Sequence, residues 1–138
     1  MTYSLRLEQK PSYLHATVTG PNSRANVARY LDEVVAECMA RKCDYALIEE
    51  RLEGPRLRMM DVFDLAAQRG KPLIARLKGV AYVDVNAEGD LMQFAEDVAV
   101  NRGTPVRVFA TIEEAERWLQ KQIDASARRA QERARRGA

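Results

Sequence analysis

The chain has 138 residues, of which 46% are hydrophobic and 30% charged, and its formal net charge is +2. This length suits one domain whose core needs no disulfide or metal to hold it, and the composition is that of a globular protein. No apolar run approaches the roughly 20 residues of a membrane span. The N-terminus MTYSLRLEQK lacks the apolar centre of a signal peptide, so we expect a cytoplasmic protein.

The positive charge is concentrated at the C-terminus. Residues 124–138, DASARRAQERARRGA, contain five Arg, one Asp and one Glu and carry +3, which leaves −1 for residues 1–123. We therefore expect a folded domain over 1–123 and a basic tail over 124–138 that is a frayed helix or disordered. The near-neutral body lacks the basic face of a nucleic-acid-binding domain, so no nucleic-acid partner is expected. The tail is either simply solvated or in contact with anionic lipid or nucleic acid.

Alternating apolar and polar residues predict two strands at the start of the chain, Ser4–Lys10 and Tyr13–Thr19. Pro11 and Ser12 supply a tight connection between them. Strict alternation is typical of an antiparallel hairpin with one face covered and the other facing water.

Helices and strands then alternate along the chain. From Asn22 the apolar spacing becomes that of a helix, which Asn22 or Ser23 can cap. A strand is predicted over Tyr45–Glu49, followed by a loop with Gly54-Pro55 as its turn signal. A second helix is expected from about Arg58 to Arg69, before Gly70 and Pro72.

The second half repeats this pattern. We predict a strand over Leu73–Gly79, a connection through Tyr82–Ala87, a helix around Leu91–Val98 and a strand over Val106–Phe109. A last helix begins with a capping box at Thr111 and buries its apolar face as far as Ile123.

The predicted order is β-β-α-β-α-β-α-β-α. It implies a single α/β domain with a mixed five-stranded sheet, an opening antiparallel hairpin and four helices. Because the first, second and fourth predicted strands alternate, we expect one face of the sheet to be only partly covered.

Three local patterns resemble the SpoIIAA-like family of STAS-type domains, over roughly residues 3–120. The first is a strand that ends at Gly20 before a polar helix start, in VTGPNSRANVARYL. The second is YALIEE, then a loop and a helix carrying Asp61 and Phe63 in MMDVFDL. The third is VAVNRGTPVRVFATIEEAERWL. The resemblance implies a STAS-like fold, related to that of anti-sigma factor antagonists and of CRAL-TRIO lipid carriers.

The resemblance also implies a phosphorylated Ser or Thr in the loop after the third strand, where added charge controls docking. The equivalent stretch here, Arg51–Arg58, contains no hydroxyl, and no Ser or Thr occurs between Ser23 and Thr104. The sequence therefore excludes a phospho-switch at the usual position and puts an anti-sigma role in doubt.

What remains is a loop of mixed charge that runs into a methionine-rich helix start. We interpret it as a docking surface for an unknown protein partner, and a weak homodimer is compatible with it. The candidate binding residues are Arg51, Glu53, Arg56, Arg58, Met59, Met60, Asp61, Phe63 and Met92. The alternative is a carrier or sensor of a small apolar ligand or lipid, held in a groove between the second and third helices.

No catalytic set, metal site or cofactor motif is expected. The carboxylates around the loop are interpreted as a solvated cluster rather than as an acid–base pair or a magnesium site, and they are Glu49, Glu50, Glu53, Asp61 and Asp64. His15, the single histidine, is expected to be exposed on the open sheet face together with Arg76, Lys78 and Arg107. Cys38 and Cys43 are expected to be reduced thiols, because one His and two Cys are too few for a structural zinc. We therefore expect a binding module rather than an enzyme.

Overall fold

The structure is a computed structural model that describes residues 2–21, 23–53, 77–84 and 106–137. In these ranges the elements are β1 (Ser4–Gln9), β2 (Leu14–Pro21), α1 (Arg24–Ala40), β3 (Tyr45–Glu53), β4 (Gly79–Asp84), β5 (Val106–Phe109) and α4 (Ile112–Arg136). The predicted helices at about 58–69 and 91–98 lie outside the described residues. Neither described helix combines the length and the hydrophobicity of a membrane span.

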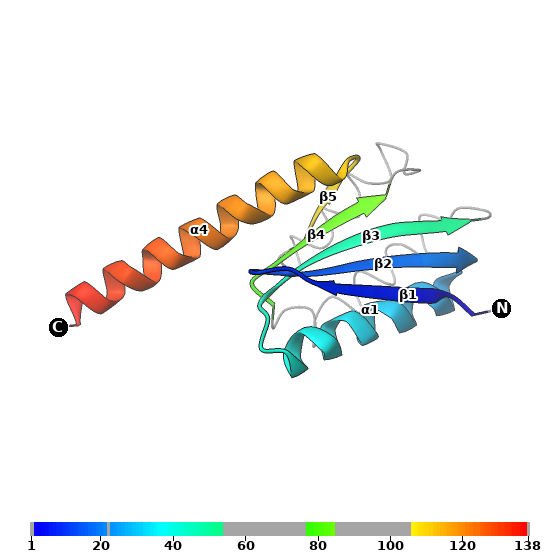
Figure 1. Cartoon of the computed structure of the whole chain (residues 1–138), viewed down its shortest axis with the longest axis horizontal. Coiled ribbons are helices and arrows are strands. Elements are labelled where there is room, and N and C mark those ends of the chain that lie inside the picture. The colour runs from blue at the N-terminus through cyan, green and yellow to red at the C-terminus, as the bar shows by residue number, and fades with distance from the viewer. Residues whose placement is uncertain (1, 22, 54–76, 85–105, 138) are drawn as a thin grey trace.

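The five strands form one mixed sheet in the order β1-β2-β3-β4-β5 (Figure 1). β1 and β2 pair antiparallel as a hairpin, whereas β2, β3, β4 and β5 are parallel to one another. The predicted α/β class with a mixed five-stranded sheet is therefore confirmed. β3 is the central strand, and it is paired over its length with β2.

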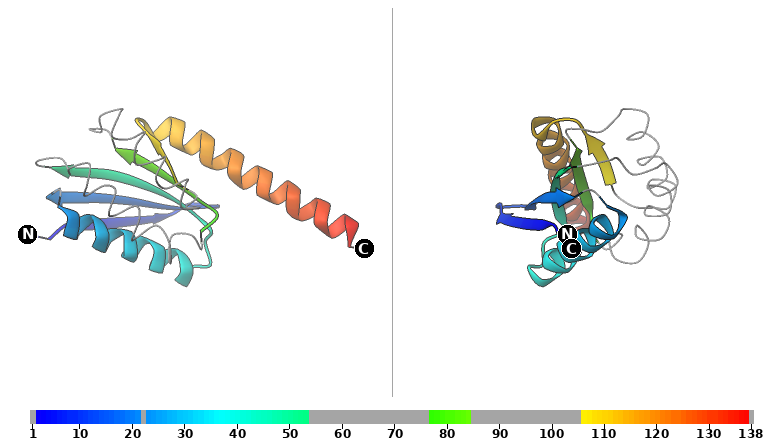
Figure 2. Two further views of the ribbon diagram at one scale, coloured as in Figure 1. Left: turned by 180° about the vertical axis from the view of Figure 1, so that it is seen from behind. Right: turned by 90° about the vertical axis from the view of Figure 1, so that its right-hand side faces the viewer.

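Two helices cover opposite faces of this sheet (Figure 2). One core lies between α1 and the sheet and consists of Leu14, Ala16, Val18, Val27, Tyr30, Val34, Val35, Cys38, Ala46, Ile48, Leu52, Leu77 and Val80. The second core lies under α4 and consists of Tyr45, Leu47, Ala81, Val83, Ala115 and Leu119. We call the two faces the α1 face and the α4 face.

Both described helices begin at capping residues that the sequence indicated. The Ser23 hydroxyl accepts a hydrogen bond from the Asn26 backbone N–H at 3.1 Å, and the Thr111 hydroxyl accepts one from the Glu114 N–H at 3.3 Å. Each bond satisfies a donor that the first helical turn leaves unpaired.

The end of β2 requires glycine. Gly20 has φ +126°, and a Cβ there would lie 2.9 Å from the Cα of Tyr3, the residue just before β1. Any larger residue would meet backbone in a conformation that L-residues rarely adopt. The backbone of β1 can thus lie close to the point where the chain leaves β2 for α1.

Two predicted strand boundaries were wrong. β3 continues to Glu53, so Arg51 and Glu53 belong to the strand and not to the following loop. Of the strand predicted over Leu73–Gly79, residues 73–76 lie outside the described residues and Leu77 and Lys78 form a bend. The described strand here is β4, Gly79–Asp84, which runs into the stretch taken for a connection. β4 is buried on both faces at Val80, Ala81 and Val83, so its sequence lacks the alternation that was used to find strands.

The last helix is longer than its apolar pattern indicated. α4 continues to Arg136 without a break, although its buried residues are Ala115 and Leu119. From Ala127 to Gly137 every residue is exposed, and this part of the helix projects beyond the sheet (Figure 1).

The packing of the second core predicts that the stability of the fold depends strongly on one leucine of α4. Leu119→Ala removes a fully buried side chain and should lower the free energy of unfolding by about 2–5 kcal/mol. Met39→Ala, at a position 43% exposed on α1, is the control and should change it by about 0.5 kcal/mol or less. Urea unfolding followed by the fluorescence of Trp118 measures both, and equal effects would contradict this packing.

The two free cysteines should differ in reactivity. Burial raises the pKa of the Cys38 thiol to about 12, which keeps it protonated and unreactive. Cys43 is only half-buried, and its Sγ donates to the Tyr45 carbonyl at 3.2 Å. At mildly alkaline pH, iodoacetamide should modify Cys43 at least about tenfold faster than Cys38, and urea should remove the difference, as mass spectrometry would show. Equal rates in the folded protein would contradict the burial of Cys38.

Candidate functional site

Two consecutive glutamates near the carboxyl end of β3 are buried on opposite faces of the sheet. Glu49 is 5% exposed on the α4 face and Glu50 is 7% exposed on the α1 face. A buried carboxylate is strongly unfavourable unless hydrogen bonds or opposite charges compensate it. The earlier interpretation of these residues as part of a solvated loop was therefore wrong, and each needs partners on its own face.

Glu50 obtains its partners from α1 and the neighbouring strand. The Tyr30 hydroxyl, from α1, donates to Oε2 of Glu50. Tyr30 is also hydrogen-bonded to the Tyr82 hydroxyl of β4, with the two oxygens 2.5 Å apart. Tyr30 is fully buried and Tyr82 half-buried. This cluster ties one helix and two strands together beneath the end of β3.

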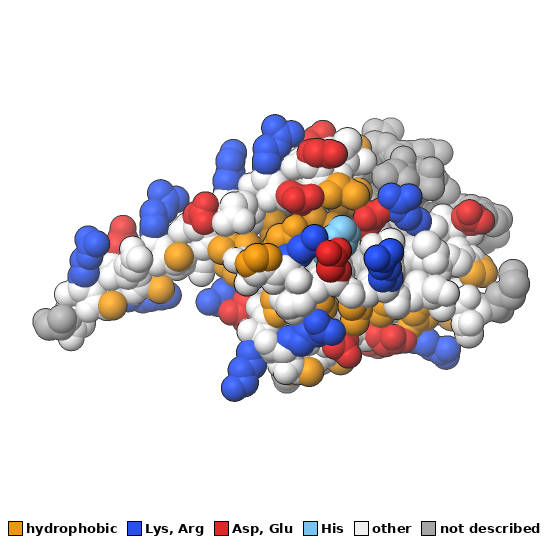
Figure 3. All heavy atoms as spheres, in the orientation of Figure 1, with side chains coloured by type: hydrophobic (Ala, Val, Ile, Leu, Met, Phe, Trp, Pro, Cys, Tyr) orange, Lys and Arg blue, Asp and Glu red, His pale blue; other side chains and the backbone are white. Residues whose placement is uncertain are grey.

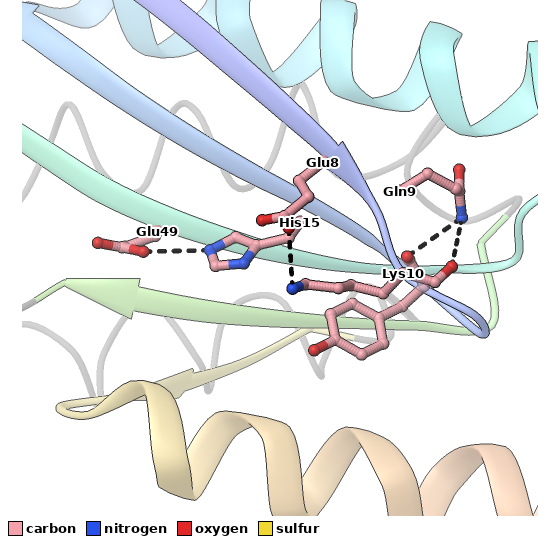
Figure 4. Close-up of polar contacts among 6 residues, drawn as sticks. Glu8, Gln9, Lys10, His15 and Glu49 are labelled. Carbon is pink, nitrogen blue, oxygen red and sulfur yellow. Dashed lines mark hydrogen bonds and ion pairs between the residues drawn. The ribbon is translucent and has the colours of Figure 1, made fainter.

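Glu49 is held on the other face by two basic side chains. The His15 Nε2 lies 3.1 Å from Oε1 of Glu49 (Figure 4), and the Arg51 Nε donates to Oε2 of the same carboxylate. Only 16% of the His15 side chain is exposed, so the expectation of an exposed surface histidine was wrong. The parallel pairing of β2 with β3 sets Thr17 opposite Glu49, which brings His15 within reach of the carboxylate.

The half of the α4 face over β1 and β2 is polar. Arg6 and Glu8 of β1 are exposed there, and Thr17 is half-exposed. Lys10 Nζ contacts Glu8 Oε1 at 3.1 Å, and this hydrogen bond lowers the pKa of Glu8 (Figure 4). Charged side chains of both signs gather over this half, with hydrophobic ones between them and α4 (Figure 3).

The four cations expected on one open face do not all meet there. Arg107 of β5 shares the α4 face with His15, and its guanidinium carbon lies 6.0 Å from the ring centre of Phe109. Lys78 precedes β4 and lies 3.6 Å from Asp44 instead. Arg76 lies outside the described residues. No shared anion site among all four is therefore present.

Two of the nine candidate binding residues lie in the described part of the chain. Arg51 and Glu53 are exposed at the carboxyl end of β3, on either side of the buried Leu52. The other seven lie outside the described residues: Arg56, Arg58, Met59, Met60, Asp61, Phe63 and Met92.

In the described part of the chain, the polar site residues make contacts that hold β3 to its neighbours. The hydrogen bond of the His15 side chain in this part of the chain reaches a carboxylate and no Ser, Thr or Cys nucleophile. The ranges that the structure describes contain no group of three or more His, Cys, Asp or Glu that could hold a metal ion. The two buried carboxylates of β3, Glu49 and Glu50, are instead used in contacts that join β3 to its neighbours.

Sequence reasoning missed Tyr30 and Tyr82 altogether. A signal was present, since adjacent glutamates at the end of a buried strand point to opposite faces, and each then needs a polar partner on its face.

The comparisons with known proteins concern the fold. No protein-family model matches the chain, and no curated protein matches it significantly. The chain is similar to a solved structure of an uncharacterized protein from the DUF3478 family with a SpoIIAA-like fold, from Shewanella loihica PV-4. The two are 21% identical, the match covers 86% of this chain and 93% of that chain, and the TM-score is 0.47. The neighbour carries the fold that the sequence resemblance named, but a likeness of this degree assigns no activity.

The Glu50 cluster predicts a specific effect of removing one hydroxyl. Tyr30→Phe withdraws a donor from a buried carboxylate and should lower the free energy of unfolding by about 1–3 kcal/mol. Tyr45→Phe is the matched control, because its hydroxyl donates to the Gln122 carbonyl over a long 3.5 Å. The control should lose about 1 kcal/mol or less in urea unfolding. A larger loss in the control than in Tyr30→Phe would contradict the anchoring of Glu50.

Proposed function

We propose that the chain is a non-enzymatic, SpoIIAA-like binding module that docks a protein partner at the carboxyl end of β3 and the segment that follows it. The observation that supports this most is the anchoring of Glu49 on one face and Glu50 on the other, which holds the carboxyl end of β3 from both sides. Ligands of open α/β sheets bind at the carboxyl ends of the parallel strands. Anchoring of this kind gives a docking surface a rigid base.

The exposed residues at this end suit a protein surface. Arg51 carries positive charge and Glu53 negative charge, one residue apart along the strand. Mixed charge of this kind orients a partner with complementary charges and disfavours partners that place like charges opposite it. It has less effect on affinity itself. The methionine-rich residues that follow, predicted from the sequence, would supply adaptable apolar contact to the same partner.

Anchoring also bears on the alternative functions. An enzyme that used Glu49 as a general base would need it within reach of a substrate proton, whereas here both carboxylate oxygens contact basic side chains. The lipid or apolar-ligand carrier stays a prediction from the sequence, since no contact among the described residues favours it.

Charge reversal at the end of β3 tests the docking proposal. Glu53→Lys changes an exposed residue and should reduce capture of the physiological partner by tenfold or more, since it places like charge beside Arg51. Glu8→Lys on β1 is the matched control, with the same charge change at an exposed strand position, and should capture the partner normally. Quantitative mass spectrometry of proteins crosslinked in cells to each variant makes the comparison.

Two outcomes would overturn this proposal. One is a partner set that Glu53→Lys leaves unchanged or that Glu8→Lys removes equally. The other is turnover of a substrate from a hydrolase panel that Glu49→Gln abolishes while the fold is intact by circular dichroism.

A further inference from the structure

The C-terminal part of α4 is a helix that touches nothing else in the described structure. We call Ala127–Arg136 the arginine arm. Every side chain in it is exposed, and it projects beyond the edge of the sheet (Figure 1 and the left view of Figure 2). Basic side chains line the projecting part of the helix (Figure 3). The arm has no core to contribute to, so its sequence is free to serve a surface role.

The basic residues of the arm lie on one side of the helix. Its five cations are Arg128, Arg129, Arg133, Arg135 and Arg136. At about 3.6 residues per turn they occupy an arc of roughly 160°. The opposite side carries Ala127, Ala130 and Ala134. The arm thus presents an arginine face of about three turns, with Glu132 in the middle of it.

The helix dipole accounts for only some of these positive charges. Arg133, Arg135 and Arg136 lie in the last turn, where positive charge is favoured by the helix dipole. Arg128 and Arg129 lie about two turns earlier, beyond the reach of that effect. Arg129 and Arg133 are also four residues apart, and like charges at this spacing destabilise a helix. An anionic partner along this face would relieve that repulsion.

The residue types indicate phosphate rather than a membrane surface. Helices that lie on membranes bury large apolar side chains such as Trp, Phe or Leu, and the apolar residues of the arm are alanines alone. All five cations are Arg and none is Lys. The planar guanidinium binds phosphate oxygens through two parallel hydrogen bonds, which an ammonium group cannot do.

We propose that the arginine arm binds the phosphate backbone of duplex DNA without sequence preference. The arm is about 15 Å long, and a single helix fits the major groove of B-DNA, which is about 12 Å wide. Its only amide side chain, Gln131, lies toward the alanine side, away from the arginine face. The near-neutral body argued against a nucleic-acid partner, but here the projecting helix alone supplies the charge. The inference is independent of partner docking at β3.

The salt dependence of DNA binding tests this proposal on the full-length protein. Fluorescence anisotropy with a short labelled DNA duplex of mixed sequence should give a log–log slope against salt of about −4.5 or shallower, from five arginines at about 0.9 each. Arg129→Gln with Arg133→Gln should make that slope shallower by about 1.8. Glu132→Gln should tighten binding at constant salt, because it removes the one negative charge from the arginine face.

The matched control removes two cations from the packed part of the same helix. Arg117→Gln with Lys121→Gln makes the same charge change at exposed positions outside the arm and should leave the slope unchanged. Hydrogen exchange of the Arg128–Arg136 amides should slow when DNA is added. Each of three results would overturn the proposal: no DNA binding at about 50 mM salt, an equal effect of the control pair, or binding to phosphatidylserine vesicles but not to DNA.

Discussion

The burial of two adjacent carboxylates in the central strand is the constraint on which the site depends. Because successive side chains of a strand point to opposite faces, Glu49 and Glu50 demand polar partners on both sides of β3. His15 and Arg51 meet this demand on one face, and Tyr30 on the other. Removing one partner leaves a buried carboxyl group without its hydrogen bond, which is less favourable than the loss of one hydrogen bond in water. The position of β3 is therefore coupled to β2, α1 and β4 at once.

The two helices cover different strands of the sheet on its two faces. α1 covers β2 and β3 on one face, and α4 covers β3, β4 and β5 on the other. The half of the α4 face formed by β1 and β2 carries polar residues, which pair with one another, as Lys10 does with Glu8. The region where both coverings overlap is β3, the strand that also carries both buried glutamates. Packing and electrostatics thus converge on one strand.

Local signals predicted the local parts of this fold. The hairpin, the capped start of α1 at Ser23 and the capping box at Thr111 follow from patterns within a few residues, and all three are present. β4 was misplaced because a strand buried on both faces carries no alternation. The Glu50 cluster was missed for a different reason. Tyr30 lies 20 residues from Glu50 in the sequence and 52 residues from Tyr82. Only the packing of α1 over the parallel strands brings them together, and no short motif records that.

The unbroken length of α4 has a consequence for how two ligands could share this molecule. The helix runs from its packed first turns, with Trp118 against Phe109 at 5.7 Å, to Arg136 without an intervening turn or glycine. No glycine or proline interrupts the helix between these points, so the arm continues the direction of the packed part of α4. The helix would thus set where a polymer held at the arm lies relative to a protein held at β3. If the two ligands were themselves connected, binding at one site would raise the local concentration of the other, an avidity set by helix geometry rather than by a flexible linker.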